Sequence, residues 1–506
     1  MVRRYGVPLR GRRHGTSGCR REFVEYRAMQ TASRTGVCLS LLLGALAFAG
    51  VAVVGQQPQP SNGGPATTGV GLIRNDPGAF QGYTLLSPLQ SKTTFLIDMN
   101  GRVVRSWETD ATPSSIAYLQ ENGNLLRPAL VSNSPFGGRT AGAGGKVQEF
   151  AWNGDVVWDF NYVTATVLPH HDLVRLPNGN VLLIGEEKKT AEEAIAAGRL
   201  PVSVQGGELH PDALVEIKPT GRTTGDVVWT WHLWDHLIQD LDKDKANYGD
   251  VAAHPERVDI NFTAAAGRNG GPGAADWTHF NAVTYNADLD QILVSLRNFS
   301  EIWIIDHSTT TQQAAGKTGG RGGRGGDLLY RWGNPQAYRA GTATDRRLFG
   351  QHNAHWIAKG LQGAGHLLIY NNGDGRPQGM YSTVEEIVLP VDASGRYPLA
   401  AGGKYGPDGS VWNYTAPNPT DFYSFNISGA MRLPNGNTLI CAGAPGIIFE
   451  ITPEKKIVWQ YNLPTFGDGR GNRNVFRALR IAPDFPGLKD RQLTPGKPLV
   501  EMGRPN

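Results

Sequence analysis

The chain has 506 residues, of which 65 are glycine and 32 are proline, and its formal net charge is +4. Abundant glycine and proline with few helix-forming segments favour a β-protein rich in turns over a helical protein. The net charge is small for this length, and much of the basic excess lies in the first 35 residues, so charge indicates neither a nucleic-acid partner nor an acidic one.

The N-terminal part carries the features of an export signal. Residues 35–55 form one uncharged apolar run that follows Arg34 and precedes a Gln/Pro/Ser/Gly-rich stretch. A basic flank, an apolar middle and small residues near the end predict a cleaved secretory signal. Because the run approaches the length that spans a bilayer, a retained N-terminal membrane anchor is the alternative. We expect residues 1–55 to be extension and signal, 56–68 a polar linker, and 69–506 one exported domain, periplasmic or extracellular, with no stable membrane insertion after cleavage.

The three cysteines do not predict a disulfide framework. Cys19 and Cys38 lie in or before the segment that we expect to be removed, which leaves Cys441 without an internal partner. Packing must therefore stabilise the fold, with Cys441 as a small buried residue of a strand at 437–442.

From about residue 69 the chain repeats a unit of two hairpins. The first hairpin carries an Asn-Gly turn between two runs of alternating apolar residues. It occurs at 114–130, 170–187 and 428–443, with looser versions at 279–297 and 352–373. The second hairpin has a last strand that carries tryptophan. It occurs at 94–107, 147–160, 214–232, 302–333, 384–415 and 448–461.

Two hairpins make a four-stranded meander, and the meander recurs about six times along the chain. Four-stranded units repeated around an axis are the blades of a propeller. The sequence therefore predicts an all-β fold, a six-bladed β-propeller of four-stranded antiparallel blades. The recurring tryptophan is expected to pack between neighbouring blades. The strand-like segment from Asn474 is expected either to close the ring or to add an outer strand.

Two inserted stretches interrupt the repeat. Residues 186–200 have helical composition and predict a helix inserted in a loop. Residues 316–327 are rich in Gly and Arg, which is typical of nucleic-acid-binding RGG tracts. Because this tract is short and stands alone, we favour a flexible surface loop between two strands of one blade, and we expect no nucleic-acid partner.

Histidines recur at the start of the first strand of several repeats. Alignment of the hairpins on their turns places His171 there, and the looser copies place His279 and His352 at the same point. The first strand of a propeller blade lines the central channel, so radial symmetry should bring these three imidazoles to one mouth of it. Each histidine alone is more often structural, whereas three in register favour a shared site. Neutral imidazole can act as nucleophile, general base or general acid.

Arg376 follows the next strand on a Gly-rich turn. A guanidinium there is expected to bind a tetrahedral anion through paired N–H donors, and a solvated turn arginine is the alternative. Three histidines from separate blades can also hold a metal, but no carboxylate cluster accompanies them, so we expect none.

Two common catalytic motifs are missing from the sequence. No Gly-rich phosphate loop follows a strand and opens a helix, which argues against a nucleotide sulfate or phosphate donor. No G-x-S-x-G nucleophile elbow occurs either. We therefore expect no cofactor.

At these residues the chain resembles the arylsulfate sulfotransferase (arylsulfotransferase) family of exported six-bladed propellers, over about residues 80–480. The likeness is most specific in DWTHFNAV (276–283), FGQHNAHWI (349–357), NNGDGR (371–376) and NVFRALR (474–480). The resemblance implies transfer of a sulfuryl group from a phenolic sulfate ester to a phenol acceptor, without a nucleotide donor, through a sulfated histidine. It further implies that three side chains hold the sulfuryl oxygens and neutralise their charge, namely His279, His352 and Arg376.

The chain departs from the family pattern at one position. The family's sulfated histidine lies downstream of the arginine, whereas this chain has no histidine after His366. The remaining candidate nucleophiles are His171, His279 and His352. Substrate contacts are expected from Asn281, Asn353, Tyr423, Asn426 and Ser428.

Because fold carries over better than activity, two other functions stay open. One is a non-catalytic exported propeller that binds an anionic ligand or a partner protein. The other is a propeller oxidoreductase that depends on a quinone or a metal.

Overall fold

The computed structural model describes residues 63–137, 142–263, 274–399, 403–467 and 471–503. The chain divides into two units, and the described residues all belong to the second, Pro60–Asn506. The predicted export signal at 35–55 lies outside the described residues. Among the helices of the described ranges, none has the length and apolar character required to cross a bilayer.

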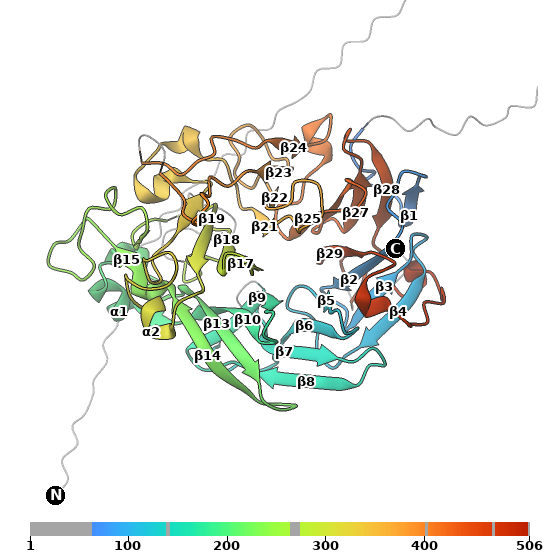
Figure 1. The fold of residues 1–506 in the computed structure, drawn as a ribbon, viewed down its shortest axis with the longest axis horizontal. Helices are drawn as coiled ribbons and strands as arrows, with labels where there is room; N and C mark the ends of the chain where they lie inside the picture. The colour runs from blue at the N-terminus through green and yellow to red at the C-terminus, as the bar shows by residue number, and fades with distance from the viewer. Residues whose placement is uncertain (1–62, 138–141, 264–273, 400–402, 468–470, 504–506) are drawn as a thin grey trace, which may run out of the picture. The chain divides into compact units, whose positions relative to one another are not determined.

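The described residues form six antiparallel blades arranged as a β-propeller (Figure 1). From its innermost strand outward, blade one contains β29 (Val475–Ile481), β2 (Tyr83–Pro88), β3 (Thr93–Ile97) and β4 (Val103–Glu108). In the same order, blade two contains β5 (Tyr118–Leu119), β6 (Leu125–Leu130), β7 (Gly145–Phe150) and β8 (Val156–Asn161). Blade three contains β9 (Val167–Arg175), β10 (Val181–Glu187), β13 (Asp212–Pro219) and β14 (Gly225–His232).

The second half of the ring follows the same pattern. Blade four contains β17 (Phe280–Asn286), β18 (Gln291–Leu296), β19 (Glu301–Asp306) and β20 (Tyr330–Trp332). Blade five contains β21 (His352–Trp356), β22 (Leu367–Asn371), β23 (Thr383–Ile387) and β24 (Trp412–Tyr414). Blade six contains β25 (Ser428–Arg432), β26 (Thr438–Ala442), β27 (Ile447–Ile451), β28 (Ile457–Asn462) and, as a fifth strand, β1 (Gly71–Asn75). The predicted all-β six-bladed fold is therefore confirmed.

The C-terminal strand closes the ring. β29 pairs antiparallel with β2, with Tyr83 opposite Ile481 and Leu86 opposite Ala478. The innermost strand of blade one thus comes from the far end of the chain, which leaves only short sheet edges exposed. Of the two roles expected for the segment from Asn474, ring closure is the one observed.

Tryptophans of the outer strands join neighbouring blades. In five of the blades, the indole N–H donates to a backbone carbonyl of the next blade. The accepting carbonyl lies in the loop that leads into the outer strand of that next blade. The pairs are Trp107 to Ala151 (3.2 Å), Trp158 to Thr224 (3.0 Å), Trp231 to Gly326 (2.7 Å), Trp332 to Pro407 (2.8 Å) and Trp459 to Met99 (2.9 Å). A buried indole N–H needs a hydrogen-bond acceptor, and each of these five seams supplies a carbonyl. Tryptophan therefore recurs at the same place in successive blades.

Short elements occupy the connections between strands. The helices are α1 (Ala191–Ala196) and α2 (Thr311–Ala314), and the 3₁₀ turns are η1 (Pro201–Ser203), η2 (Leu233–His236), η3 (Pro335–Tyr338), η4 (Ala343–Asp345), η5 (Pro419–Asp421), η6 (Pro486–Leu488) and η7 (Leu499–Glu501). Two small ladders pair β11 (Lys189–Thr190) with β12 (Glu208–Leu209) and β15 (Leu237–Ile238) with β16 (Val258–Asp259).

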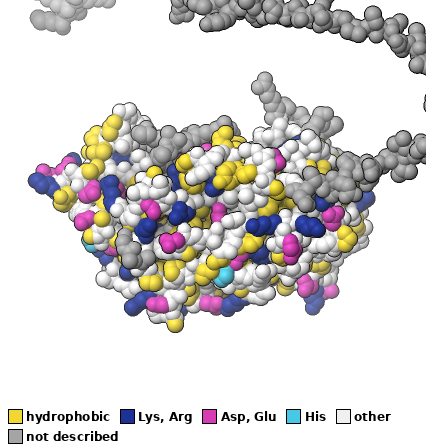
Figure 2. Space-filling view, turned by 90° about the horizontal axis from the view of Figure 1, so that it is seen from above, with side chains coloured by type: hydrophobic (Ala, Val, Ile, Leu, Met, Phe, Trp, Pro, Cys, Tyr) yellow, Lys and Arg dark blue, Asp and Glu magenta, His cyan; other side chains and the backbone are white. Residues whose placement is uncertain are grey.

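The two inserted stretches lie in connections between strands, and the helix in the first is shorter than residues 186–200, because β10 and β11 extend to Thr190. α1 lies in the connection between β10 and β13, and Thr190 and Glu193 form a capping box at its start. The Gly/Arg-rich residues 316–327 connect β19 to β20 within blade four, and the backbone N–H of Gly322 donates to Oδ2 of Asp306. The face in Figure 2 mixes basic and acidic side chains, in line with the small net charge.

Candidate active site

An unusual backbone conformation occurs within or directly before the inner strands of blades three, four and five. His171, His279 and Asn353 have φ of 52°, 59° and 52°, in the left-handed region that non-glycine residues rarely adopt. The pairing of each strand with its neighbour also changes register there, as in a β-bulge. The same bend thus recurs in three inner strands, in the middle of β9 and at the start of β17 and β21. In blade five the left-handed residue is Asn353, so His352 lies one residue earlier than the alignment of hairpins placed it.

The three predicted histidines lie together in the structure. The rings of His171 and His279 are 4.7 Å apart between centroids. The ring of Phe476, on the closing strand β29, lies 5.7 Å from that of His171 and 5.9 Å from that of His352. All three imidazoles are buried, with His352 only 1% exposed. Four blades, including the one closed by β29, therefore contribute to this histidine cluster.

Asn372 holds His352 in one tautomer. The amide nitrogen of Asn372 donates to the carbonyl of Ser424 (2.7 Å) and to Oγ of Ser428 (2.8 Å), which turns its Oδ1 toward Nδ1 of His352 at 2.8 Å. The carbonyl of Gly350 also faces this Nδ1, at 3.1 Å. Both neighbours are acceptors, so Nδ1 carries the hydrogen and Nε2 keeps a lone pair. Within the described ranges, Nε2 has no hydrogen-bond partner.

The pKa of His352 lies far below its ordinary value. Burial is the largest cause and the positive charge of Arg297 the next, and together they outweigh the hydrogen bond of Asn372 and lower this pKa to about 3. His352 is therefore a neutral imidazole at physiological pH, with a nucleophilic nitrogen available.

His279 is oriented by a carboxylate. Its Nδ1 lies 2.6 Å from Oδ2 of Asp276, which accepts the hydrogen bond and leaves Nε2 to hold or release a proton. Burial raises the pKa of Asp276, but the charge and the hydrogen bond of His279 outweigh it, so this pKa lies below its ordinary value. The pair is an aspartate–histidine arrangement suited to proton transfer.

A second aspartate–histidine pair, Asp212 and His170, contacts His171. Nε2 of His170 lies 2.7 Å from Oδ1 of Asp212, and Nδ1 of His170 lies 2.7 Å from Nδ1 of His171. Burial lowers the pKa of His170, but the hydrogen bond and charge of Asp212 raise it above its ordinary value. Burial and the neighbouring charges of His279 and His170 hold the pKa of His171 well below its usual range. The protonation of His170 thus decides which nitrogen of His171 carries the hydrogen.

Two buried arginines beside the histidines were not predicted from the sequence. Arg297 pairs with Asp374 (2.6 Å between Nη2 and Oδ2). Burial is the largest cause of the low pKa of both His171 and His352, and the charge of Arg297 is a smaller cause in the same direction. Arg477 of β29 pairs with Asp172 at 3.2 Å. Nε of each arginine is buried without a partner among the described residues. The available signal for Arg477 was its place in NVFRALR.

The residues expected to contact substrate have different surroundings. Asn281 donates to the carbonyl of Gln351 (2.7 Å), Asn353 accepts from the N–H of Ala430 (3.0 Å), and Ser428 receives the bond from Asn372. These groups support the histidine cluster. Of these five residues, Asn281 and Asn426 have an amide oxygen that is buried without a partner in the described part of the chain. Tyr423 is half-buried.

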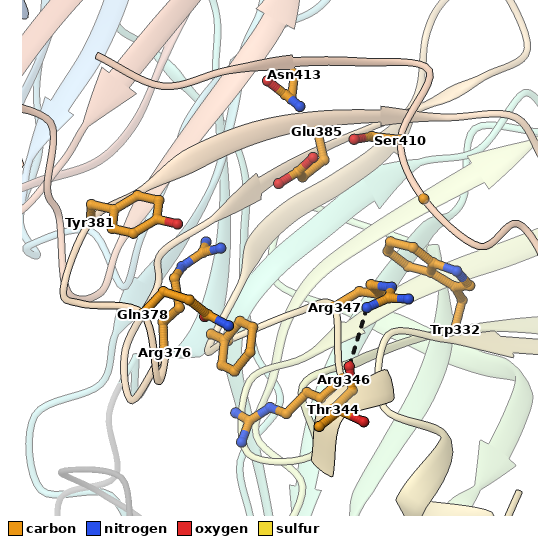
Figure 3. Close-up of a pocket in the computed structure, with 12 residues that line it drawn as sticks. Trp332, Thr344, Arg346, Arg347, Arg376, Gln378, Tyr381, Glu385, Ser410 and Asn413 are labelled. Carbon is orange, nitrogen blue, oxygen red and sulfur yellow. Dashed lines mark hydrogen bonds between the residues drawn. The ribbon is translucent and has the colours of Figure 1, made fainter. Parts of the chain in front are cut away.

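Arg376 points into a different space from the histidines. It lines a pocket of about 320 Å³ with Phe349, Tyr381 and Glu385, and the lining includes none of the three histidines (Figure 3). Its Cζ lies 4.5 Å from the ring centroid of Tyr381 and 5.1 Å from that of Phe349. The turn at 371–376 nevertheless joins both places, because it also carries Asn372, which holds His352, and Asp374, which pairs with Arg297.

The donor set around the histidines does not form a metal site. Within the described ranges no three His, Cys, Asp or Glu residues lie together in a way that could hold a metal ion.

The fold and this cluster define a six-bladed β-propeller in which imidazoles and guanidiniums from four blades lie together. The sequence matches the profile of the family described as Arylsulfotransferase (ASST) over residues 75–462. The chain belongs to this family, which confirms the resemblance inferred from its motifs.

Individual relatives are more distant. The arylsulfate sulfotransferase AssT of Escherichia coli O6:H1 (strain CFT073) is 25% identical over 381 residues, which cover 71% of this chain and 58% of that protein. The chain therefore matches less than two thirds of this relative's length. A solved protein of unknown function from Bacteroides caccae is 13% identical with a TM-score of 0.41, covering 79% of this chain and 99% of that one. Virginiamycin B lyase from Staphylococcus aureus is 9% identical with a TM-score of 0.32, covering 79% and 84%.

Proposed function

We propose that this protein transfers a sulfuryl group from a phenolic sulfate ester to a phenol acceptor, with His352 as the nucleophile and without a nucleotide sulfate donor. The observation that carries the proposal is the fixed tautomer of His352. Its Nδ1–H faces the oxygens of Asn372 and Gly350, and its buried Nε2 keeps a lone pair. Membership of the arylsulfotransferase family supports sulfuryl transfer in general.

In the first half-reaction, Nε2 of His352 attacks sulfur and the bond from sulfur to the phenolic oxygen breaks. The departing phenolate takes a proton from Nε2 of His279, whose Nδ1 is held by Asp276 at 2.6 Å. Arg297, which lowers the pKa of His352 through its charge, neutralises the sulfuryl oxygens as the bond breaks.

In the second half-reaction, the phenol acceptor attacks sulfur and gives its proton to Nε2 of His279. The bond between sulfur and Nε2 of His352 breaks, which restores the neutral imidazole. The two steps exchange one phenol for another, and the proton returns to its starting nitrogen.

The test is to incubate the full chain with p-nitrophenyl sulfate and phenol. We expect nitrophenol release that depends on phenol, and intact-mass analysis without phenol should show one added SO₃ group on His352. His352→Asn should abolish both signals, whereas His254→Asn, on a half-exposed histidine paired with Glu256, should leave both unchanged. Absence of release and of the adduct from folded protein would refute the proposal.

A second candidate, a non-catalytic propeller that binds an anionic ligand, is favoured by the lack of any histidine after His366. It predicts that p-nitrophenyl sulfate binds the protein without turnover. We also propose that the protein is exported, because residues 35–55 read as a secretory signal.

A further inference from the structure

Four blades carry a glutamate near the end of their third strand, counted from the innermost one. In three of these blades, an arginine from the innermost strand of the next blade pairs with the glutamate. The pairs are Glu149 with Arg175, Glu386 with Arg432 (2.6 Å) and Glu450 with Arg480 (3.3 Å). An arginine keeps its charge through and above the neutral range, so these three seams are held in the same way across it.

The seam between blades three and four, which are neighbours in the ring (Figure 1), uses a histidine in this place. The glutamate of blade three is Glu216 on β13, and within the described residues no arginine pairs with it. Its Oε2 lies 2.9 Å from Nε2 of His307, the residue that follows β19 of blade four. Oε1 of Glu216 accepts hydrogen bonds from Asn178 (3.0 Å) and Asn180. Of these four seams, only this one depends on a side chain that titrates near neutral pH.

His307 lies between two carboxylates. Its Nδ1 is 2.8 Å from Oδ1 of Asp290, which lies in the turn between β17 and β18. Both ring nitrogens therefore face acceptor oxygens, and only the imidazolium form can donate from both. His210 also lies between two carboxylates, Glu186 and Glu208, but all three belong to blade three and its inserted connection. Among the described histidines with this arrangement, only His307 spans two blades.

The other side chains around His307 do not replace its charge. The rings of Trp229 on β14 and Tyr285 on β17 pack against the imidazole, with centroids 4.9 Å and 5.3 Å away. The hydroxyl of Tyr285 donates to Oδ1 of Asp290 at 2.7 Å. Arg321 of the Gly/Arg-rich loop lies 3.9 Å from Asp290, but its side chain is 65% exposed and solvent screens its charge. The imidazole is thus enclosed by two rings, two carboxylates and one screened cation.

The pKa values of this cluster define the pH range in which the contact is complete. Burial lowers the pKa of His307, but the hydrogen bonds and charges of Glu216 and Asp290 outweigh burial and raise it above its ordinary value. Burial raises the pKa of each carboxyl group, but their hydrogen bonds, including those from His307, outweigh it and lower both. The stabilisation from His307 is therefore complete in mildly acidic solution, below about pH 6.5, and is lost as pH rises through the raised pKa.

Loss of the proton breaks one of the two contacts. A neutral imidazole carries one N–H and one lone pair, so His307 can then donate to Glu216 or to Asp290 but not to both. The other carboxylate faces a lone pair, and the positive charge between the two carboxylates is gone. Glu216 lies roughly 13 Å along β13 from Asp212, which contacts His170 beside the histidine cluster. The weakened contact is therefore at the end of the seam away from the cluster.

We propose that His307 is a pH-sensitive clamp between blades three and four, closed while its imidazole is charged and open once it loses a proton. His171 lies on β9 of blade three and His279 directly precedes β17 of blade four, so their two rings lie on either side of the same seam. Opening of the clamp loosens the seam that sets the distance between them, 4.7 Å between centroids. The clamp requires no catalytic step, so it is independent of the activity proposed above.

Hydrogen-exchange mass spectrometry of the full chain tests the clamp at about pH 6 and about pH 9, with rates corrected for intrinsic exchange. Peptides that cover β13 and residues 285–307 should lose protection about tenfold or more at the higher pH, because one charge-assisted contact between blades is lost. Peptides of β23 and β25 should keep their protection, because Arg432 holds Glu386 at both pH values. Equal protection of the first set at both pH values would overturn the clamp, and so would an equal loss in both sets.

Variants assign the effect to His307. His307→Gln is uncharged at every pH, so its seam should be as poorly protected at about pH 6 as that of wild type at about pH 9. His366→Gln is the matched control and should behave as wild type, since His366 contacts Glu386 (2.7 Å) but Arg432 remains to hold that glutamate. A pH-dependent loss of protection in His307→Gln as large as in wild type would overturn the clamp.

A second variant keeps the clamp testable even where His307→Gln does not fold. Asp290→Asn removes one of the two negative charges beside the imidazole, so the loss of protection should begin at lower pH, by about one pH unit, when exchange is followed at several pH values. A transition at the same pH as in wild type would show that His307 does not control the seam.

Discussion

Asn372 joins His352 of blade five to Ser428 of blade six, with 2.8 Å on each side of its amide. The orientation of the amide is fixed because its nitrogen also donates to the carbonyl of Ser424, and a turned amide would place its oxygen against that carbonyl oxygen. The tautomer of His352 is therefore set by Asn372 and, through it, by blade six.

Replacement of Asn372 tests this relationship. Asn372→Leu removes the acceptor for Nδ1, so His352 should lose its fixed orientation and nitrophenol release should fall about 10- to 100-fold with the fold intact. Asn372→Asp places a negative charge beside the ring and should raise the pKa of His352, which steady-state rates measured against pH would report as a new loss of activity on the acid side. An unchanged pH profile in Asn372→Asp would contradict the role given to this residue.

Asp276 is expected to control His279 in a similar way. In Asp276→Asn the amide nitrogen can face Nδ1 of His279 and donate to it, which moves the hydrogen to Nε2 and removes the basic nitrogen from the proposed reaction. We expect kcat to fall about 10²- to 10⁴-fold, the usual range for loss of a general acid–base group. Asp288→Asn, on an exposed aspartate paired with Lys359, is the matched control. Equal rates in the two variants would exclude His279 as the group that moves the proton.

The blades and the tryptophan seams were predictable because their causes are local. Asn-Gly turns fix hairpins, and a tryptophan in each unit needs a partner across the seam. Ring closure was only narrowed to two possibilities, since the pairing of β29 with β2 joins opposite ends of the chain. The site was less predictable. The register change in β21 places His352 one residue earlier than the alignment of hairpins did. Nothing in the sequence distinguishes Arg297 from other arginines that follow a strand. The direction of the Arg376 side chain depends on its contacts with the rings of Phe349 and Tyr381, which are tertiary contacts.

The buried neutral histidines predict loss of stability in acid. The pKa of His352 is about 3 in the folded protein, against an ordinary value of about 6.5 that applies when the chain is unfolded. Between these values the unfolded chain binds a proton that the folded one does not, so the free energy of unfolding falls as pH drops from about 6.5 toward 3. The pKa of His171 is shifted in the same direction. The raised pKa of His170 acts above this range, because its stabilisation is complete below about pH 6.5 and is lost only as pH rises through its folded pKa.

Urea unfolding at several pH values measures this effect. Wild type should lose at most about 1.4 kcal/mol per pH unit for each such histidine below pH 6.5. His352→Asn keeps a donor toward Asn372 and should show a shallower slope, while His254→Asn should not. Parallel slopes for wild type and His352→Asn would mean that His352 accepts its proton without unfolding.

The ion pair between Arg331 and Glu301 lies in the core of blade four, and both side chains are fully buried. Nε of Arg331 donates to Oε1 of Glu301 at 3.0 Å, and the guanidinium also lies 4.6 Å from the ring centroid of Tyr338. Removal of either partner leaves the other as an unpaired buried charge. Arg331→Met should therefore lower the free energy of unfolding by about 3–5 kcal/mol, and the double variant with Glu301→Gln should recover part of that loss. Denaturant unfolding of the two single variants and the double variant gives the coupling energy between Arg331 and Glu301. Strictly additive losses of unfolding free energy would mean that this coupling energy is zero and would contradict the prediction.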